Sequence, residues 1–172
     1  IGGGIKMNSG CFGTEFKDRI MSIQCLDTLG NIRIIPANKI KFSYRNIELS
    51  EKLIFLSATF KGNLSEQNKI KSTMYDLHKK KNNSQPSKIK TGGSTFKNPI
   101  DQTNKKAWEL IKESVPPNLN FGDASISPKH YNFFVNNKNA TFEEMNSLIN
   151  YVKKNVKDKT GIKINLEIKI IE

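Results

Sequence analysis

Three polar residues, far apart along the chain, are the best candidates for chemistry. Ser94 follows a glycine pair in TGGSTFKNP (91–99), Arg45 lies in KFSYRN (41–46), and Glu167 lies near the C-terminal end. A guanidinium group binds a carboxylate or phosphate through two parallel hydrogen bonds, whereas a hydroxyl and a carboxyl group can exchange protons with a substrate. Each also has a simpler interpretation: a turn hydroxyl for Ser94, a solvated carboxylate for Glu167, and a lone surface cation for Arg45.

Other familiar site patterns are weak. Residues 1–13, IGGGIKMNSGCFG, are predicted to form a glycine-rich loop that could lay N–H groups along a phosphate or a flat ring, but the G-x-G-x-x-G spacing is missing. Ser94 lacks the G-x-S-x-G context of a hydrolase nucleophile. Cys11 and Cys25 form no Cys-x-x-Cys motif, and the two histidines are far apart, so we expect no metal site.

The chain is basic, with a net charge of +12 from 28 basic and 16 acidic residues. Almost all of the basic residues are lysines. Proteins that bind nucleic acids or phosphates favour arginine, whose planar guanidinium donates two parallel hydrogen bonds. A basic nucleic-acid-binding module therefore remains an alternative, although Tyr131, Phe133 and Phe134 have no arginine near them in the sequence. Apolar runs such as LIFL at 53–56 are too short to span a bilayer, and no leader is visible. We expect a cytoplasmic protein with no membrane partner.

The front half is predicted to be mainly sheet, followed by one helix. Residues 20–26 and 31–35 are predicted to form a hairpin around Leu29-Gly30-Asn31, and 53–60 to form a further strand. Residues 65–81 change to a helical period, with Ser65 as the cap and Ile70, Met74 and Leu77 on one face. The polar segment 82–88 is the best linker, so we predict domains at 1–82 and 83–172.

The back half is predicted to be a small α+β lobe. A short helix is expected at 104–114, ending before Pro116-Pro117. Thr141 and Glu144 have the spacing of a capping box that opens a long helix to Gly161. Residues 162–171 alternate and predict a strand with apolar residues on one face and polar residues, including Glu167, on the other.

Six segments carry a resemblance to a known family. They are GGGIKMNSGCFGTE (2–15), FSYRN (42–46), QP (85–86), TGGSTFKNP (91–99), GDASISPKHYNFFVN (122–136) and INLEIKII (164–171). In this order they resemble the UDP-N-acetylmuramate dehydrogenases, also called UDP-N-acetylenolpyruvoylglucosamine reductases, in their compact subclass. The resemblance implies an α+β fold. Residues 1–82, with the connecting helix 65–81, would be the C-terminal part of an FAD-binding α+β domain, and 83–172 a small α+β substrate-binding domain.

The resemblance also implies an activity, the NADPH- and FAD-dependent reduction of UDP-N-acetylglucosamine enolpyruvate to UDP-N-acetylmuramate for peptidoglycan. Hydride would pass from flavin N5 to C3 of the enol ether. Arg45 would bind the substrate carboxylate, Ser94 would give a proton to C2, and Glu167 would share a proton with the developing enol oxygens. The three would therefore meet around one cleft, where Gly92 and Gly93 leave room for the flavin and substrate. The alternative is a UDP-sugar-binding fragment without catalysis.

Further residues acquire roles only from this resemblance. Gly3, Asn8, Gly10 and Arg45 would contact the flavin, and Tyr44, Lys97 and Asn98 the substrate. Ser84 stands where the family commonly has a basic residue near the UDP diphosphate, and Lys79, Lys80 and Lys81 are the nearest candidates to replace it. The expected partners are NADPH and the small-molecule substrate, with a monomeric protein and no nucleic acid.

Overall fold

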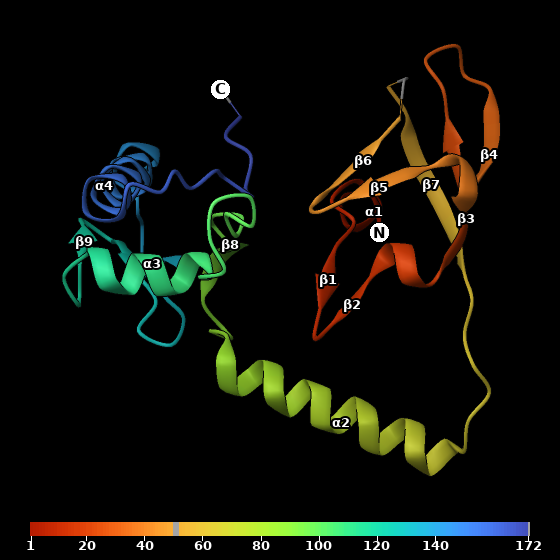
Figure 1. The fold of residues 1–172 in the computed structure, drawn as a ribbon, viewed down its shortest axis with the longest axis horizontal. Coiled ribbons are helices and arrows are strands. Elements are labelled where there is room, and N and C mark those ends of the chain that lie inside the picture. The colour runs from red at the N-terminus through yellow and green to blue at the C-terminus, as the bar shows by residue number, and fades with distance from the viewer. Residues whose placement is uncertain (50–51, 172) are drawn as a thin grey trace. The chain divides into compact units, whose positions relative to one another are not determined.

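The computed structural model describes residues 1–49 and 52–171 and divides the chain into two compact units, Ile1–Thr73 and Met74–Glu172 (Figure 1). Both units combine helices with antiparallel sheets, so the predicted α+β class is confirmed. Helix α2 (Gln67–Ser84) runs across the division. The predicted boundary at 82/83 falls near the end of this helix and stays a prediction.

The first unit is built around a three-stranded antiparallel sheet in the order β4-β3-β7. Its strands are β3 (Ile20–Leu26), β4 (Ile32–Pro36) and β7 (Ile54–Phe60), which confirms the predicted hairpin and the third strand. The turn between β3 and β4 closes because the Asp27 carboxylate accepts hydrogen bonds from the main-chain N–H groups of Leu29 and Asn31. The bond from Asn31 is the main reason that the pKa of Asp27 lies below its usual value.

Two small hairpins and short helical turns complete this unit. The hairpins are β1 (Gly10–Cys11) with β2 (Thr14–Glu15), and β5 (Lys41–Ser43) with β6 (Asn46–Glu48). The turns are η1 (Phe16–Asp18) and η2 (Ala37–Lys39). The core consists of five buried isoleucines: Ile5, Ile20, Ile23, Ile40 and Ile47.

The predicted loop at 1–13 is wrong in its first part, because Gly2–Lys6 form helix α1. Three successive glycines have poor helix propensity. Burial of the Ile5 side chain in the core offsets this cost, and Gly4 lies so close to Phe16 that an added Cβ would come within 2.9 Å of its ring. The helix therefore forms because of its packing and not because of its local sequence.

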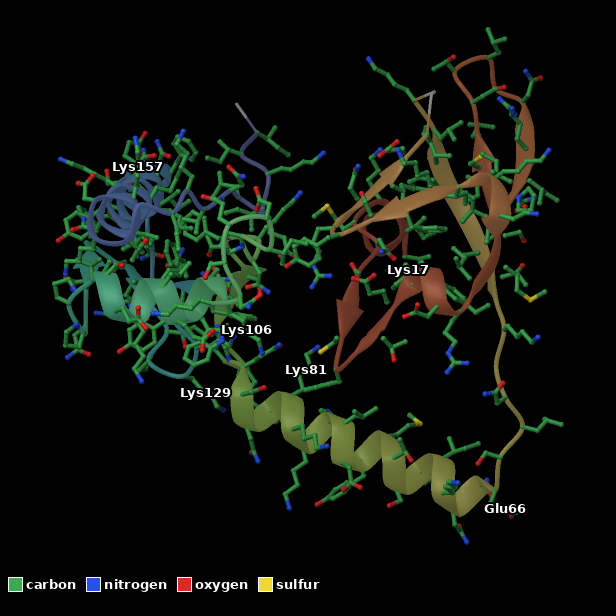
Figure 2. All side chains as sticks on the ribbon, viewed as in Figure 1. Lys17, Glu66, Lys81, Lys106, Lys129 and Lys157 are labelled. Carbon is green, nitrogen blue, oxygen red and sulfur yellow. The ribbon has the colours of Figure 1, made fainter. Side chains whose placement is uncertain are left out.

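Helix α2 confirms the predicted helix, although it begins at Gln67 and continues to Ser84, into the expected linker. None of its residues is buried, and its side chains project on all sides (Figure 2). Ile70, Met74 and Leu77 are 39–65% exposed, so the described residues do not cover the predicted apolar face. Across residues 1–49 and 52–171, no helix is long and apolar enough to cross a membrane.

The second unit contains a four-stranded antiparallel sheet in the order β8-β11-β10-β9. Its strands are β8 (Lys90–Ser94), β9 (Asn120–Phe121), β10 (Ala124–Ile126) and β11 (Phe133–Asn136). Helices α3 (Ala107–Ser114) and α4 (Phe142–Thr160) pack on each other, and α4 packs on β9 and β10. Apolar residues from both helices and the sheet form one core, which includes Phe96, Leu110, Phe134, Leu148 and Val152.

Both helices confirm the predicted elements, and α4 begins and ends as predicted. The Thr141 hydroxyl accepts from the Glu144 N–H at 3.2 Å, and the Glu144 carboxylate accepts from the Thr141 N–H at 3.0 Å. Gly161 ends the helix in the left-handed region, with φ of +72°. Helix α3 begins at Ala107, three residues later than predicted.

The predicted strand at 162–171 is wrong as a strand, although its alternation is real. Ile164 is buried, and Ile162, Leu166 and Ile168 pack against the core. The main chain pairs only locally with residues 95–97, through a single bridge between Phe96 and Leu166 and two hydrogen bonds beside it. The pairing does not extend beyond residue 97 toward Pro99, because Pro99 lacks an N–H and turns the chain away from residues 162–171.

Candidate active site

Arg45 lies in the tight turn between β5 and β6. Ser43 pairs with Asn46, which leaves Tyr44 and Arg45 as a two-residue turn. Arg45 has a φ of +53°, a left-handed conformation that costs an ordinary residue about 1–2 kcal/mol. The guanidinium lies 5.0 Å from the centroid of the Tyr44 ring, and Nη2 donates to the Gly10 carbonyl at 3.3 Å. The turn therefore holds a strained arginine over an aromatic ring.

Asn8 and Glu15 connect this turn to the β1–β2 hairpin. The Asn8 amide is fully buried: Nδ2 donates to Glu15 Oε2 at 3.0 Å and to the Ser43 carbonyl at 3.2 Å, and Oδ1 accepts from the Lys17 N–H at 3.0 Å. Glu15 also pairs with Lys17 at 2.9 Å and lies 3.8 Å from Nη1 of Arg45. The hydrogen bond and charge of Glu15 raise the pKa of Lys17 above its usual value.

The glycines of this region have different structural roles. A Cβ at Gly10 would come within 2.6 Å of Glu15 Cγ, so glycine is required for the close β1–β2 pairing. Gly3 is exposed, and a Cβ there would meet nothing within 4 Å. The predicted flavin contacts of Gly3, Asn8 and Gly10 stay predictions, and the side chain of Asn8 is fully engaged inside the unit.

Two cavities flank the β1–β2 hairpin. One, of about 500 Å³, includes Glu15, Lys17, Asp18, Tyr44 and Arg45 in its lining. The other, of about 420 Å³, is mostly apolar and includes Phe16, Arg19 and Phe60. Binding sites for ligands typically enclose 300–1,000 Å³, so each cavity has the volume of a small-molecule site. The residues present are therefore compatible with part of an FAD site.

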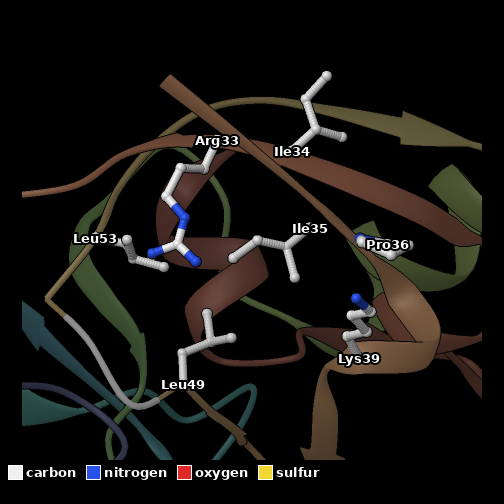
Figure 3. A pocket seen from close by; sticks show the side chains of 7 residues that line it. All are labelled: Arg33, Ile34, Ile35, Pro36, Lys39, Leu49 and Leu53. Atoms are coloured by element: carbon white, nitrogen blue, oxygen red, sulfur yellow. The ribbon is translucent and has the colours of Figure 1, made fainter. Parts of the chain in front are cut away.

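A third cavity lies beneath β4, with a volume of about 270 Å³ (Figure 3). Arg33 and Lys39 point toward it among aliphatic side chains from Ile35, Leu49 and Leu53. It contains none of the predicted site residues, and we assign it no role.

Ser94 ends strand β8 and pairs with Phe133 of β11. It is half-buried. Gly93 has a φ of +86°, which favours glycine, and a Cβ at Gly92 would lie 3.4 Å from the Ile168 side chain. The glycine pair therefore gives the backbone turn before Ser94 and lets the C-terminal segment approach closely.

Glu167 lies on the segment next to Ser94. Its N–H donates to the Thr95 carbonyl at 2.8 Å, and the neighbouring Leu166 forms the bridge with Phe96. Glu167 is half-buried, not turned fully to solvent as an isolated surface carboxylate would be. The second unit thus brings the predicted hydroxyl and carboxyl groups onto adjacent segments, although 73 positions separate them in the sequence (167 minus 94).

The segment after Ser94 is clamped by Asn132, which the sequence interpretation missed. Its buried side-chain amide accepts from the Phe96 N–H at 2.9 Å and donates to the Phe96 carbonyl at 2.8 Å. The main-chain carbonyl of Asn132 also accepts from the Thr95 N–H at 2.7 Å. The only signal in the sequence is a polar residue inside the aromatic run YNFF. Glu15 was missed in the same way, because its partners come from other elements.

The two predicted substrate residues that follow Ser94 are also held by main-chain contacts. The Lys97 N–H donates to the Asn165 carbonyl at 2.8 Å. The Asn98 side chain accepts from the Ala107 N–H at 2.9 Å and so caps the start of α3. Both are half-buried, and their contact with a substrate stays a prediction.

A basic cavity of about 420 Å³ adjoins Ser84 in the second unit. Lys106, Lys112 and Lys129 line it, together with His130 and aromatic residues. Lys106 and Lys129 can be seen in Figure 2. His130 Nδ1 accepts from the Asn132 N–H at 3.2 Å, and burial, with the charge of Lys106, lowers its pKa. His130 therefore has a structural hydrogen bond and also lines the cavity.

Comparison with known proteins identifies the family. The model of the UDP-N-acetylenolpyruvoylglucosamine reductase C-terminal domain matches residues 85–171, half of the chain. The chain belongs to the UDP-N-acetylenolpyruvoylglucosamine reductase family. This confirms the resemblance that the six sequence segments carried.

Individual relatives of this family match the whole chain. UDP-N-acetylenolpyruvoylglucosamine reductase of Pelagibacter ubique is 58% identical over 172 residues, and that of Rickettsia bellii is 43% identical over 171 residues. The crystal structure of the reductase (MurB) from Thermus caldophilus is similar with a TM-score of 0.82 at 27% identity, over 98% of this chain and 59% of that one. The chain spans 57% and 56% of the two curated relatives, so it corresponds to a little over half of a family member.

Within the family, the structure separates the three predicted catalytic residues into two groups. Arg45 belongs to the first unit, and Ser94 and Glu167 belong to the second. The two latter residues lie on adjacent segments. That Arg45 joins them at one cleft stays part of the proposal below.

Proposed function

We propose that this chain provides the substrate-binding domain and part of the flavin-binding domain of an NADPH- and FAD-dependent reductase. The reaction converts UDP-N-acetylglucosamine enolpyruvate to UDP-N-acetylmuramate in peptidoglycan precursor synthesis. The observation that carries the proposal is the 58% identity to a named reductase along the entire chain, with Arg45, Ser94 and Glu167 all present. Expected partners are NADPH and this small-molecule substrate.

In the proposed mechanism, a bound reduced flavin supplies the hydride that C3 of the enol ether accepts. Arg45 binds the substrate carboxylate, on which negative charge develops as C3 is reduced. A cation held at that position stabilises the developing charge. The turn between β5 and β6 places the guanidinium over the Tyr44 ring, 5.0 Å from its centroid.

Ser94 then gives its proton to C2, and Glu167 shares a proton with the enol oxygens. A serine hydroxyl is a weak acid, but a carbanionic carbon is a strong base, so the transfer is feasible when its geometry is fixed. The Asn132 clamp on residues 95–96 and the hydrogen bond from Glu167 to Thr95 supply that fixed geometry.

The basic cavity next to Ser84 offers a place for the UDP diphosphate. Lys106, Lys112 and Lys129 line it, whereas Lys79, Lys80 and Lys81 do not. We therefore propose that lysines from the α3 and β10–β11 regions, and not those of α2, take over from the basic residue that Ser84 replaces.

The test is a stopped-flow comparison in the full-length holoenzyme. We expect Ser94→Ala to leave flavin reduction by NADPH within about twofold of wild type and to slow flavin reoxidation by the enolpyruvyl substrate at least about 100-fold, the lower end of the range for one general acid. Ser125→Ala, which removes a hydroxyl from the same sheet, is the control and should leave both rates unchanged. An unchanged reoxidation rate in Ser94→Ala would remove Ser94 from the mechanism.

A further inference from the structure

The Glu15 carboxylate contacts three other side chains of the first unit. Its two oxygens lie near three nitrogen atoms from different parts of the chain: Asn8 Nδ2 at 3.0 Å, Lys17 Nζ at 2.9 Å and Arg45 Nη1 at 3.8 Å. The Glu15 main chain is fixed as well, because its N–H donates to the Asp18 carboxylate at 2.7 Å and it pairs with Gly10 across the hairpin. The carboxylate is therefore held independently of Arg45.

Arg45 is long and flexible, so its turn alone cannot orient the guanidinium. The Gly10 carbonyl accepts from Nη2 at 3.3 Å, and Glu15 lies beside Nη1. Both contacts come from the β1–β2 hairpin, one from each strand. The hairpin thus contacts the two terminal nitrogens of the guanidinium, which sets the plane of the fork.

Charge alone does not make this cavity attract anions. Lys17 and Arg45 are balanced by Glu15 and Asp18 in the same lining. A carboxylate would therefore bind here because a guanidinium fork is presented in the correct plane, and not because the cavity has an excess of positive charge.

We propose that Glu15 is a positioning residue for Arg45, a role that rests on the proposed function of Arg45 as the carboxylate-binding cation. Glu15 acts by orienting the guanidinium, and is itself held by Asn8 and Lys17.

The decisive variant is Glu15→Gln in the full-length holoenzyme, because glutamine keeps the size and an acceptor oxygen and removes the charge beside Arg45. We expect flavin reoxidation by the enolpyruvyl substrate to slow about 10- to 100-fold, the range for a misplacement of about 1 Å in a reacting group. Flavin reduction by NADPH should stay within about twofold. Glu48→Gln is the matched control: it breaks the exposed 2.9 Å pair with Lys41 in the same hairpin as Arg45 and should change neither rate.

A double-mutant cycle with Arg45→Lys distinguishes positioning from general support of the fold. If Glu15 acts through Arg45, adding Glu15→Gln to Arg45→Lys should slow reoxidation no further than Arg45→Lys does alone. The proposal would be overturned if the double variant slowed reoxidation by the product of the two single effects. It would also be overturned if Glu15→Gln alone kept the wild-type reoxidation rate. Should Glu15→Gln not fold, Glu15→Asp keeps the charge and moves it away from Nη1. Slowed reoxidation with normal flavin reduction would then support the role, and wild-type rates would refute it.

The outcomes also separate this inference from the proposed function. A wild-type holoenzyme whose reduced flavin is not reoxidised by the enolpyruvyl substrate contradicts the proposed function itself. A wild-type enzyme that turns over normally, with Glu15→Gln equal to it, contradicts only the role of Glu15.

Discussion

The Asn132 clamp makes the sharpest prediction about stability. In Asn132→Ala, the main-chain N–H and carbonyl of Phe96 lose their partners at 2.9 and 2.8 Å while Phe96 stays buried. Each unpaired buried group costs about 1–3 kcal/mol, so we expect the free energy of unfolding of the second unit to fall by about 3 kcal/mol or more. For a domain of this size that is a decrease in melting temperature of more than about 10 °C.

Trp108 makes this measurement specific, because it is the single tryptophan of the chain and lies in the second unit. Urea unfolding of the 172-residue chain, followed by tryptophan fluorescence, should show the midpoint lowered by roughly 2 M for a slope of about 1.5 kcal/mol/M. The control is Asn137→Ala, which removes an exposed amide that donates to the Ser125 hydroxyl at 2.9 Å and should cost less than about 0.5 kcal/mol.

A loss below about 1 kcal/mol in Asn132→Ala would show that residues 95–96 do not depend on this amide. The argument that the clamp fixes the segment next to Ser94 would then fail. Asn132→Asp gives an independent check, since it keeps the acceptor for the Phe96 N–H and loses the donor to the Phe96 carbonyl. It should also be destabilised.

Two further predictions concern the same unit. Gly93→Ala places a Cβ at a φ of +86°, so unfolding monitored by Trp108 should show a loss of about 1–2 kcal/mol, and no loss would mean that this turn relaxes freely. Burial, with a smaller contribution from Lys106, lowers the pKa of His130, so the unfolded chain binds a proton more readily than the native one. Stability should therefore decrease as pH falls below about 6.5, the ordinary histidine value, and His130→Gln should reduce that dependence, whereas an unchanged pH profile would contradict the assignment.

Local patterns were sufficient for the helices and for part of the sheet. The capping box of Thr141 and Glu144, the stop at Gly161 and the hairpin at 20–35 depend on residues close in sequence, and all three are confirmed. Arg45, Ser94 and Glu167 were found through motifs and not through periodicity. The strands β8–β11 were missed because they are only two to five residues long, and because β8 pairs with the distant strand β11.

Taken by itself, the sequence determined the α+β class, the positions of the long helices and the family, since these follow from local spacing and from motifs kept in order. Only the tertiary structure decided that the glycine run at 2–6 is a helix, because the burial of Ile5 outweighs its low propensity. It likewise decided that 162–171 is not a strand, because the partner segment offers few hydrogen-bonding groups before Pro99. The roles of Glu15 and Asn132 also required it, because every bond that defines them joins side chains to groups on other elements.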